Sequence, residues 1–88
     1  MYRVIILAPA QEGLDQIPMG EVDAVLAALG KLLTHPEEPK PYRFKQRREG
    51  WEMYVGRWKI TYELRRIELI VYVHGVKESP SLAFDYRY

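Results

Sequence analysis

Two histidines supply the imidazoles with which this protein could transfer protons near neutral pH. The chain has no cysteine and two histidines, His35 and His74, which lie in different segments. The absence of cysteine excludes disulfides, thiolate metal sites and cysteine nucleophiles, and fits a reducing compartment. No ligand spacing indicates a metal site, so we expect chemistry without a metal or other cofactor. His74 is the candidate for proton transfer, because an imidazole can donate and accept a proton near neutral pH.

Each histidine also has a purely structural interpretation. His74 follows an apolar run and, taken by itself, is better explained as a hydrogen-bonded residue at the end of a strand. His35 stands alone in a connection rich in proline and glutamate, residues 34–40, with no partner at catalytic spacing. We therefore expect His35 to be a solvent-exposed residue of a loop or helix end.

Basic side chains are concentrated in the middle of the chain. Residues 40–66 carry nine basic and three acidic side chains, a net charge of +6, whereas residues 1–39 carry −4 and residues 67–88 carry −1. Aromatic residues are interleaved with these cations, a pattern that favours a phosphate-rich partner. The alternative is a charged face that contacts only water. Candidate phosphate contacts of low sequence specificity are Arg43, Lys45, Arg47 and Arg48.

The element that would position these groups is a predicted β-hairpin over residues 51–64. Apolar and polar residues alternate on both sides of Gly56-Arg57, which indicates two strands joined by a two-residue turn. Gly56 can adopt the positive φ that a type II′ turn requires at its first central position. The predicted core face holds Trp51, Met53, Val55, Trp58, Ile60, Tyr62 and Leu64. The other face, available for binding or chemistry, holds Glu52, Tyr54, Lys59, Thr61 and Glu63.

The rest of the chain predicts the remaining elements of an α+β fold. Residues 2–8 are almost continuously apolar and predict a strand inside the sheet. Two helices are expected at residues 9–17 and 19–33 as a hairpin against that sheet. The apolar stripe of the second helix is expected to be a packing face, made of Val22, Val25, Leu26, Leu29, Leu32 and Leu33. A short extended piece at 42–50, the hairpin, and a last strand at 67–75 after a tight turn at Arg65-Arg66 make the sheet largely antiparallel.

Length and hydropathy limit the class of protein. Eighty-eight residues suit a single domain, residues 1–88. No apolar run approaches the roughly 20 residues that cross a bilayer, and the first residues are too short and strand-like for a secretory signal. We therefore expect a cytoplasmic protein that does not contact a membrane.

This arrangement, with the stretches KPYRFKQRREGWEMYVGRWKITYEL and ELIVYVHGVKES, resembles the RelE/ParE superfamily of toxins from bacterial-type toxin–antitoxin pairs. The resemblance covers residues 2–79, and its most specific part is residues 51–63. It implies a fold of an N-terminal strand, a two-helix hairpin and a three-stranded antiparallel meander, and a partner antitoxin. Members of the ribonuclease branch cut messenger RNA, commonly on the ribosome. Members of the ParE branch inhibit DNA gyrase without cutting nucleic acid.

The resemblance also implies roles for individual residues. Lys59 falls where the family usually has a phosphate-binding arginine, and Lys77 falls close to an arginine after the last strand. His74 lies near the position of a C-terminal histidine or tyrosine that some relatives use as general acid. Tyr86 is a weaker candidate for that role.

Metal-free RNA cleavage needs a base for the 2′-OH proton, cations for the charge that builds on phosphorus, and an acid for the leaving 5′ oxygen. These roles are assigned in that order to Glu52, to Lys59 with Arg57 or Lys77, and to His74. Each group has an alternative. An exposed Lys59 is also explained by a weak ion pair with Glu52 or Glu63. Tyr54 and Tyr72 are candidates for stacking on bases, or form an aromatic cross-strand pair.

Two functions follow from the resemblance. The first is an endoribonuclease acting on messenger RNA and held inactive by an antitoxin. The second is a non-catalytic binder, either an inhibitor of DNA gyrase like ParE or a degenerate member. Ribonuclease members carry two basic residues where this chain has Glu52 and Tyr54, which favours the binder, whereas His74 favours the enzyme. In either case the antitoxin would cover the sheet or the helical hairpin with an amphipathic helix and oppose the basic face with acidic groups.

Overall fold

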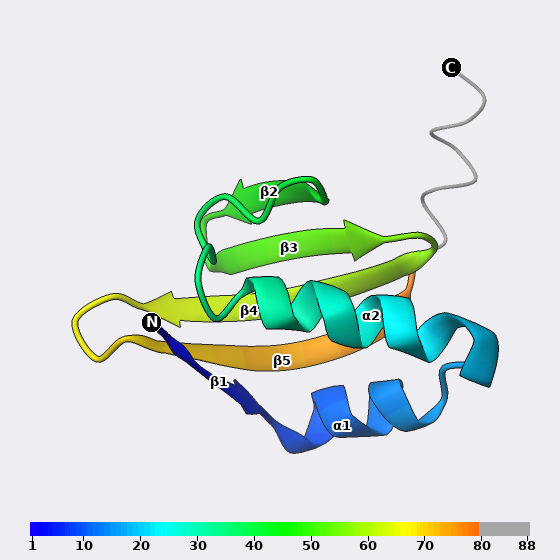
Figure 1. The fold of residues 1–88 in the computed structure, drawn as a ribbon. Coiled ribbons are helices and arrows are strands. Elements are labelled where there is room, and N and C mark those ends of the chain that lie inside the picture. Colours follow the sequence, from blue (N-terminus) through cyan, green and yellow to red (C-terminus); the bar gives the residue numbers. More distant parts are fainter. Residues whose placement is uncertain (80–88) are drawn as a thin grey trace.

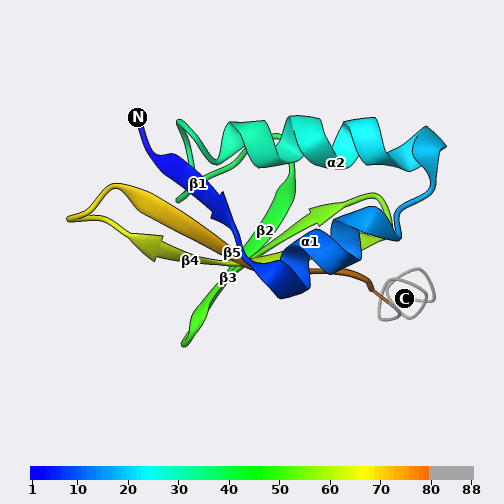
Figure 2. The ribbon, with the colours of Figure 1, turned by 90° about the horizontal axis from the view of Figure 1, so that it is seen from below.

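The computed structural model describes residues 1–79, in which two helices cover one face of a five-stranded sheet (Figure 1). In order, the elements are β1 (Arg3–Ile6), α1 (Ala8–Asp15), α2 (Met19–Lys31), β2 (Arg43–Arg47), β3 (Gly50–Val55), β4 (Trp58–Arg65) and β5 (Ile70–Glu78). The strand order is β1-β5-β4-β3-β2, with β1 parallel to β5 and every other neighbouring pair antiparallel. Figure 2 shows both helices on the same side of the sheet. The predicted α+β class is confirmed, and the short extended piece at 42–50 supplies β2, which makes the meander four-stranded.

The β3–β4 hairpin has the predicted turn and faces. Val55 pairs with Trp58 across Gly56-Arg57, and Gly56 has a φ of 57°. Arg57 has no positive φ, so the turn has the combination that type II′ requires. The apolar face is buried against the helices, with Met53 and Ile60 fully inaccessible to solvent. The polar face is therefore the open face of the sheet.

The helices pack on the core through the expected apolar residues, with two exceptions. α1 has a proline in its first turn, as the fixed φ of proline favours, and buries Leu14. α2 buries Val25 and Leu29. However, Leu26 is 50% exposed and Leu33 is 36% exposed, so the prediction that the whole stripe packs is wrong for these two. They line an apolar groove of about 440 Å³ between α1, α2 and β1, because the short β1 covers only part of the stripe.

β1 lies at the edge of the sheet, so the prediction that it runs inside the sheet is wrong. It pairs only with β5, and its apolar residues are half-buried. Val4 and Ile6 pack on the core, while Ile5 lies opposite Tyr72 on the open face. A continuous apolar run indicates that both faces of a strand are at least partly covered. It does not tell whether the strand has one neighbouring strand or two.

The last strand begins and ends later than predicted. A four-residue turn at 66–69 replaces the tight turn expected at Arg65-Arg66, and β5 extends to Glu78. Ile67 is 99% exposed at that turn, so its apolarity did not mark the strand. The strand contains an irregularity: Tyr62 pairs with Val73 and Thr61 pairs with Gly75, which leaves His74 without an opposite residue in β4. This β-bulge determines which way the side chains after residue 73 point.

Two other expectations concern the ends of the chain and its hydropathy. Residues 76–78, expected in an irregular tail, belong to β5, while residues 80–88, including Tyr86, lie outside the described part. Across residues 1–79, neither helix has the length and apolarity needed to span a bilayer.

Candidate functional site

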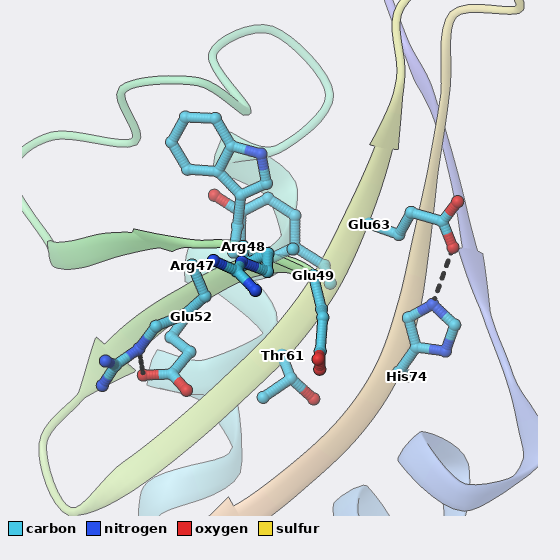
Figure 3. Close-up of a pocket in the computed structure, with 10 residues that line it drawn as sticks. Arg47, Arg48, Glu49, Glu52, Thr61, Glu63 and His74 are labelled. Atoms are coloured by element: carbon cyan, nitrogen blue, oxygen red, sulfur yellow. Dashed lines mark hydrogen bonds and ion pairs between the residues drawn. The ribbon is translucent and has the colours of Figure 1, made fainter.

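A groove of about 690 Å³ opens on the face of the sheet that the helices leave uncovered (Figure 3). The β2–β3 turn, β3, β4 and β5 supply its walls. Its lining residues are Arg47, Arg48, Glu49, Gly50, Trp51, Glu52, Thr61, Tyr62, Glu63 and His74. Four of the residues selected from the sequence thus come together in one place, namely Arg47, Arg48, Glu52 and His74.

His74 reaches the groove from the β-bulge in β5. Its side chain is about half exposed, and its Nε2 lies 3.1 Å from Oε1 of Glu63 on β4. Figure 3 shows this pair on one side of the groove. A hydrogen bond from Arg65 Nε to Glu63 Oε2 and the contact with His74 hold the pKa of Glu63 below its ordinary value. Glu63 therefore stays ionised beside the imidazole.

The opposite side of the groove holds a carboxylate that is already paired. Tyr54 Oη donates to Glu52 Oε1 at 2.6 Å, and Arg47 Nε lies 3.2 Å from the same oxygen. The hydrogen bond from Tyr54, followed by the contact with Arg47, keeps the pKa of Glu52 below its ordinary value. Burial, followed by the bond to Glu52, raises the pKa of Tyr54. Glu52, the acidic residue that departs from the family pattern, thus stays ionised, and its charge is compensated by Tyr54 and Arg47.

Next to the groove, the open face presents two lysines directly opposite each other. Lys59 on β4 pairs in register with Lys77 on β5, and Tyr54 lies on the other side of Lys59. Like charges opposite each other destabilise a sheet, and an anion bound between them would relieve that repulsion. Thr61 and Gly75 form the next pair on this face, and His74 comes three residues before Lys77, so the lysine pair and the bulge at His74 are about 10 Å apart along β5. Both residues on which the nuclease hypothesis depends therefore lie on the open face.

The remaining candidates occupy different positions. Arg43 lies 5.0 Å above the ring of Tyr54, and Lys45 is exposed opposite Glu52. Tyr72 lies opposite Glu63, with the Arg65 guanidinium 5.7 Å from its ring centroid. These side chains surround the groove without lining it.

Arg57, considered for phosphate binding, is committed elsewhere. It donates to both carboxylate oxygens of Glu21 on α2, at 2.9 and 2.8 Å, and to Glu78 at 2.6 Å. Glu21 also accepts a hydrogen bond from Trp58 Nε1 at 3.0 Å. Arg57 thus links the β3–β4 turn to α2 and to the end of β5, and it does not line the groove.

Glu63 is a residue of the groove that the sequence did not indicate as a site residue. The alternation placed it on the correct face, and its contact with His74 is a diagonal one across β4 and β5, beside the bulge. His35 is exposed as expected, with Nδ1 2.8 Å from Thr34 Oγ1. Within residues 1–79, no three histidine or carboxylate side chains are arranged to hold a metal ion.

Comparison with solved structures shows that this fold, with an open sheet face beside a helical hairpin, is the fold of RelE toxins. An archaeal RelE–RelB complex from Pyrococcus horikoshii OT3 matches with a TM-score of 0.75 and 14% identity, over 90% of this chain and 96% of that chain. The isolated E. coli RelE toxin matches with a TM-score of 0.74 and 12% identity over the full length of both chains. The toxin–antitoxin complex RelBE2 from Mycobacterium tuberculosis matches with a TM-score of 0.71 and 20% identity, over 88% and 96% of the chains.

At these identities the similarity establishes the fold, and the implied RelE-like fold is confirmed. No family model and no curated protein matches the sequence.

Proposed function

We propose that this protein is a RelE-like toxin that cleaves messenger RNA without a metal and is held inactive by an antitoxin. One observation carries the proposal: a histidine in an open groove lies about 10 Å along β5 from two lysines that oppose each other on the same face. The lysines offer charge to a phosphodiester, and the imidazole offers a proton. The RelE fold, which the solved toxins share, supports the same conclusion.

The reaction that these groups fit is an internal transfer at phosphorus. The 2′ oxygen of one nucleotide forms a bond to the adjacent phosphorus while the bond from phosphorus to the 5′ oxygen of the next nucleotide breaks. The 2′ proton leaves to a base, and the 5′ oxygen takes a proton from an acid, so the products are a 2′,3′-cyclic phosphate and a 5′-hydroxyl. Lys59 and Lys77 would stabilise the negative charge on the non-bridging oxygens.

We assign His74 as the general acid that gives a proton to the leaving 5′ oxygen. Glu52 keeps the role of base, but a carboxylate whose pKa is lowered by Tyr54 and Arg47 takes up a proton less readily than an ordinary glutamate. The larger kinetic effect should therefore come from removing His74. Arg48, exposed at the rim of the groove, is placed to contact a neighbouring phosphate.

An antitoxin partner is supported by the solved relatives, several of which are RelE–RelB complexes. A segment that inhibits this protein would place acidic groups against Lys59, Lys77 and Arg48. Such a segment would compete directly with RNA for the open face.

The test is cleavage of messenger RNA by the purified protein in a translating extract. His74→Ala and Lys59→Ala should each slow cleavage at least about tenfold. The matched control is Arg57→Gln, which removes an exposed cation of the same hairpin that is bound to Glu21 and Glu78, and it should cleave within about twofold of the wild type. Unchanged rates in both site variants would refute the site.

A second function is favoured by one observation, the neutralised Glu52 where ribonuclease relatives have a basic residue. It is a non-catalytic toxin that binds DNA gyrase. Intact messenger RNA together with inhibition of gyrase supercoiling by the wild type would establish this function and exclude the nuclease.

A further inference from the structure

We propose that Glu63 is a positioning residue that holds the His74 imidazole by Nε2, so that Nδ1 is the nitrogen that exchanges a proton with RNA. The inference rests on the proposed nuclease function and deepens it. Its basis is the contact of 3.1 Å between His74 Nε2 and Glu63 Oε1 at the edge of the groove.

The β-bulge is the first reason why His74 needs such a partner. Residues in a regular ladder are oriented by neighbours on both sides, but His74 has no opposite residue in β4. Its side chain is also about half exposed, so packing does not fix the ring. Among residues 1–79, the contact with Glu63 is therefore the interaction that orients the imidazole.

The chemistry of the contact determines which ring nitrogen of His74 binds Glu63 and which one is left to transfer a proton. An ionised carboxylate only accepts hydrogen bonds, so Nε2 must carry the hydrogen. In the neutral ring Nδ1 is then free of hydrogen, and in the protonated ring Nδ1–H is the proton available to the leaving 5′ oxygen. After that transfer the ring keeps its hydrogen on Nε2 and its bond to Glu63, so the ring need not reorient during the reaction.

Glu63 is itself held in place. Arg65 donates to its Oε2, which leaves Oε1 for His74, and this arrangement keeps the carboxylate ionised. Tyr72 lies opposite Glu63 on β5, and Arg65 also reaches Glu68 at 3.5 Å. The order of contacts is thus Arg65 to Glu63 to His74, which is the arrangement of an orienting carboxylate behind a catalytic imidazole.

An exposed ion pair with no function would contribute little to stability, and its loss would leave cleavage unchanged. The functional interpretation differs in one measurable way. If Glu63 acts only through His74, its removal should slow the chemical step in the wild type and have no further effect once His74 is gone.

The experiment measures single-turnover cleavage on translating ribosomes across a range of protein concentrations. Glu63→Ala should lower the maximal rate about tenfold and leave the concentration for half-maximal rate within about twofold. Glu63→Gln, which keeps an acceptor but not the charge, should recover part of that loss. In the His74→Ala background, Glu63→Ala should change the rate by less than about twofold. The control is Glu68→Ala, which removes a different carboxylate from Arg65 and should leave the wild-type rate.

The outcomes separate this inference from the proposed function. Cleavage that requires His74 but is unaffected by Glu63→Ala, or is slowed equally in both backgrounds, overturns the role of Glu63 alone. Cleavage that does not require His74 overturns the site and this inference together. A parallel loss of rate in Glu68→Ala would show that the effect comes from general charge around Arg65, and would also refute the role of Glu63.

Discussion

Glu52 shows how the side chains of the open face balance one another. A lone carboxylate would repel phosphate in the groove for which we propose RNA binding, but Tyr54 donates a hydrogen bond to Glu52 and Arg47 lies 3.2 Å from it. The side chain of Glu52 is only 16% exposed, so these contacts act with little competition from water. The groove therefore keeps an ionised carboxylate whose charge is already compensated.

This network predicts a specific dependence of stability on pH. The pKa of Glu52 is lower in the folded protein than in the unfolded chain, so its contribution is present above the unfolded value of about 4.5 and is lost as pH falls through the folded value. Urea unfolding at pH 7 and pH 3 should show that Glu52→Gln costs about 1–2 kcal/mol at pH 7 and less at pH 3. The control is Glu12→Gln, an exposed residue of α1, which should parallel the wild type. A Glu52→Gln deficit that persists at pH 3 would contradict the interpretation.

At the scale of the residue, the sequence predicted which side chains lie on the open face better than it predicted their partners. The chemistry of His74 and the alternation around Lys59 are readable from residue type and spacing, and both lie on the open face as expected. The pair of Glu63 with His74 was not predictable, because it depends on the register of β5 against β4, which residue type and spacing do not give. Arg57 is a different case: its charge fits phosphate, and only the fold shows that Glu21 and Glu78 already bind it.

Among the elements, α1 and β5 approach each other unusually closely at one glycine. A Cβ added to Gly13 would lie 2.0 Å from the backbone oxygen of Val76. Any side chain there must push the helix away from the strand. Because Val76 follows the bulge that carries His74, this contact also supports the geometry of the candidate site.

Two alanine substitutions test this contact. Alanine in place of a helical glycine normally stabilises by about 0.5–1 kcal/mol, so Gly30→Ala, where nothing lies within 4 Å, should raise the free energy of unfolding. Gly13→Ala should instead lower it by about 2 kcal/mol or more, since the clash with backbone exceeds the gain in propensity. Urea unfolding of both variants is the measurement. Equal stabilisation of the two would show that α1 does not press on β5.

The elements themselves were predicted with errors of a consistent kind. The hairpin at 51–64 was predicted correctly because its alternation and its glycine turn indicate the same structure. β1 and β5 were misplaced because an apolar run does not indicate which strands lie beside it or where the strand begins. Ile67, for example, belongs to the apolar run of β5 but precedes the strand and is 99% exposed. Which strand lies at the edge is set by the parallel pairing of β1 with β5, a contact between the two ends of the described chain.

For the whole molecule, the separation of charge follows the two faces. The acidic first 39 residues form β1, both helices and the connection that follows them, while the basic residues 40–66 form β2, β3 and β4. An anionic polymer would therefore approach from the open face. Its binding should depend on counterion release, and thus on salt.

The salt dependence can be measured with a single-stranded RNA methylated at every 2′ oxygen, which cannot be cleaved. Each phosphate contact contributes about −0.7 to the slope of log K against log salt for a single strand. Converting both Lys59 and Lys77 to glutamine should reduce the magnitude of the slope by about 1.4, measured by fluorescence anisotropy. Lys31→Gln, at the end of α2 on the helical side, should leave the slope unchanged. An unchanged slope in the double variant would place RNA elsewhere on the protein.

The extra residue at position 74 has a consequence for how this protein tolerates change. Side chains alternate across a strand, so one surplus residue reverses the parity of everything after it, and Val76 is buried while Lys77 meets water only because that reversal occurs. If β5 kept its length but paired with β4 without the bulge, the lysine would turn inward and the valine outward, even though every amino acid is unaltered. Deleting His74 should therefore remove the imidazole and the bulge together, yet leave Val76 buried and Lys77 on the open face.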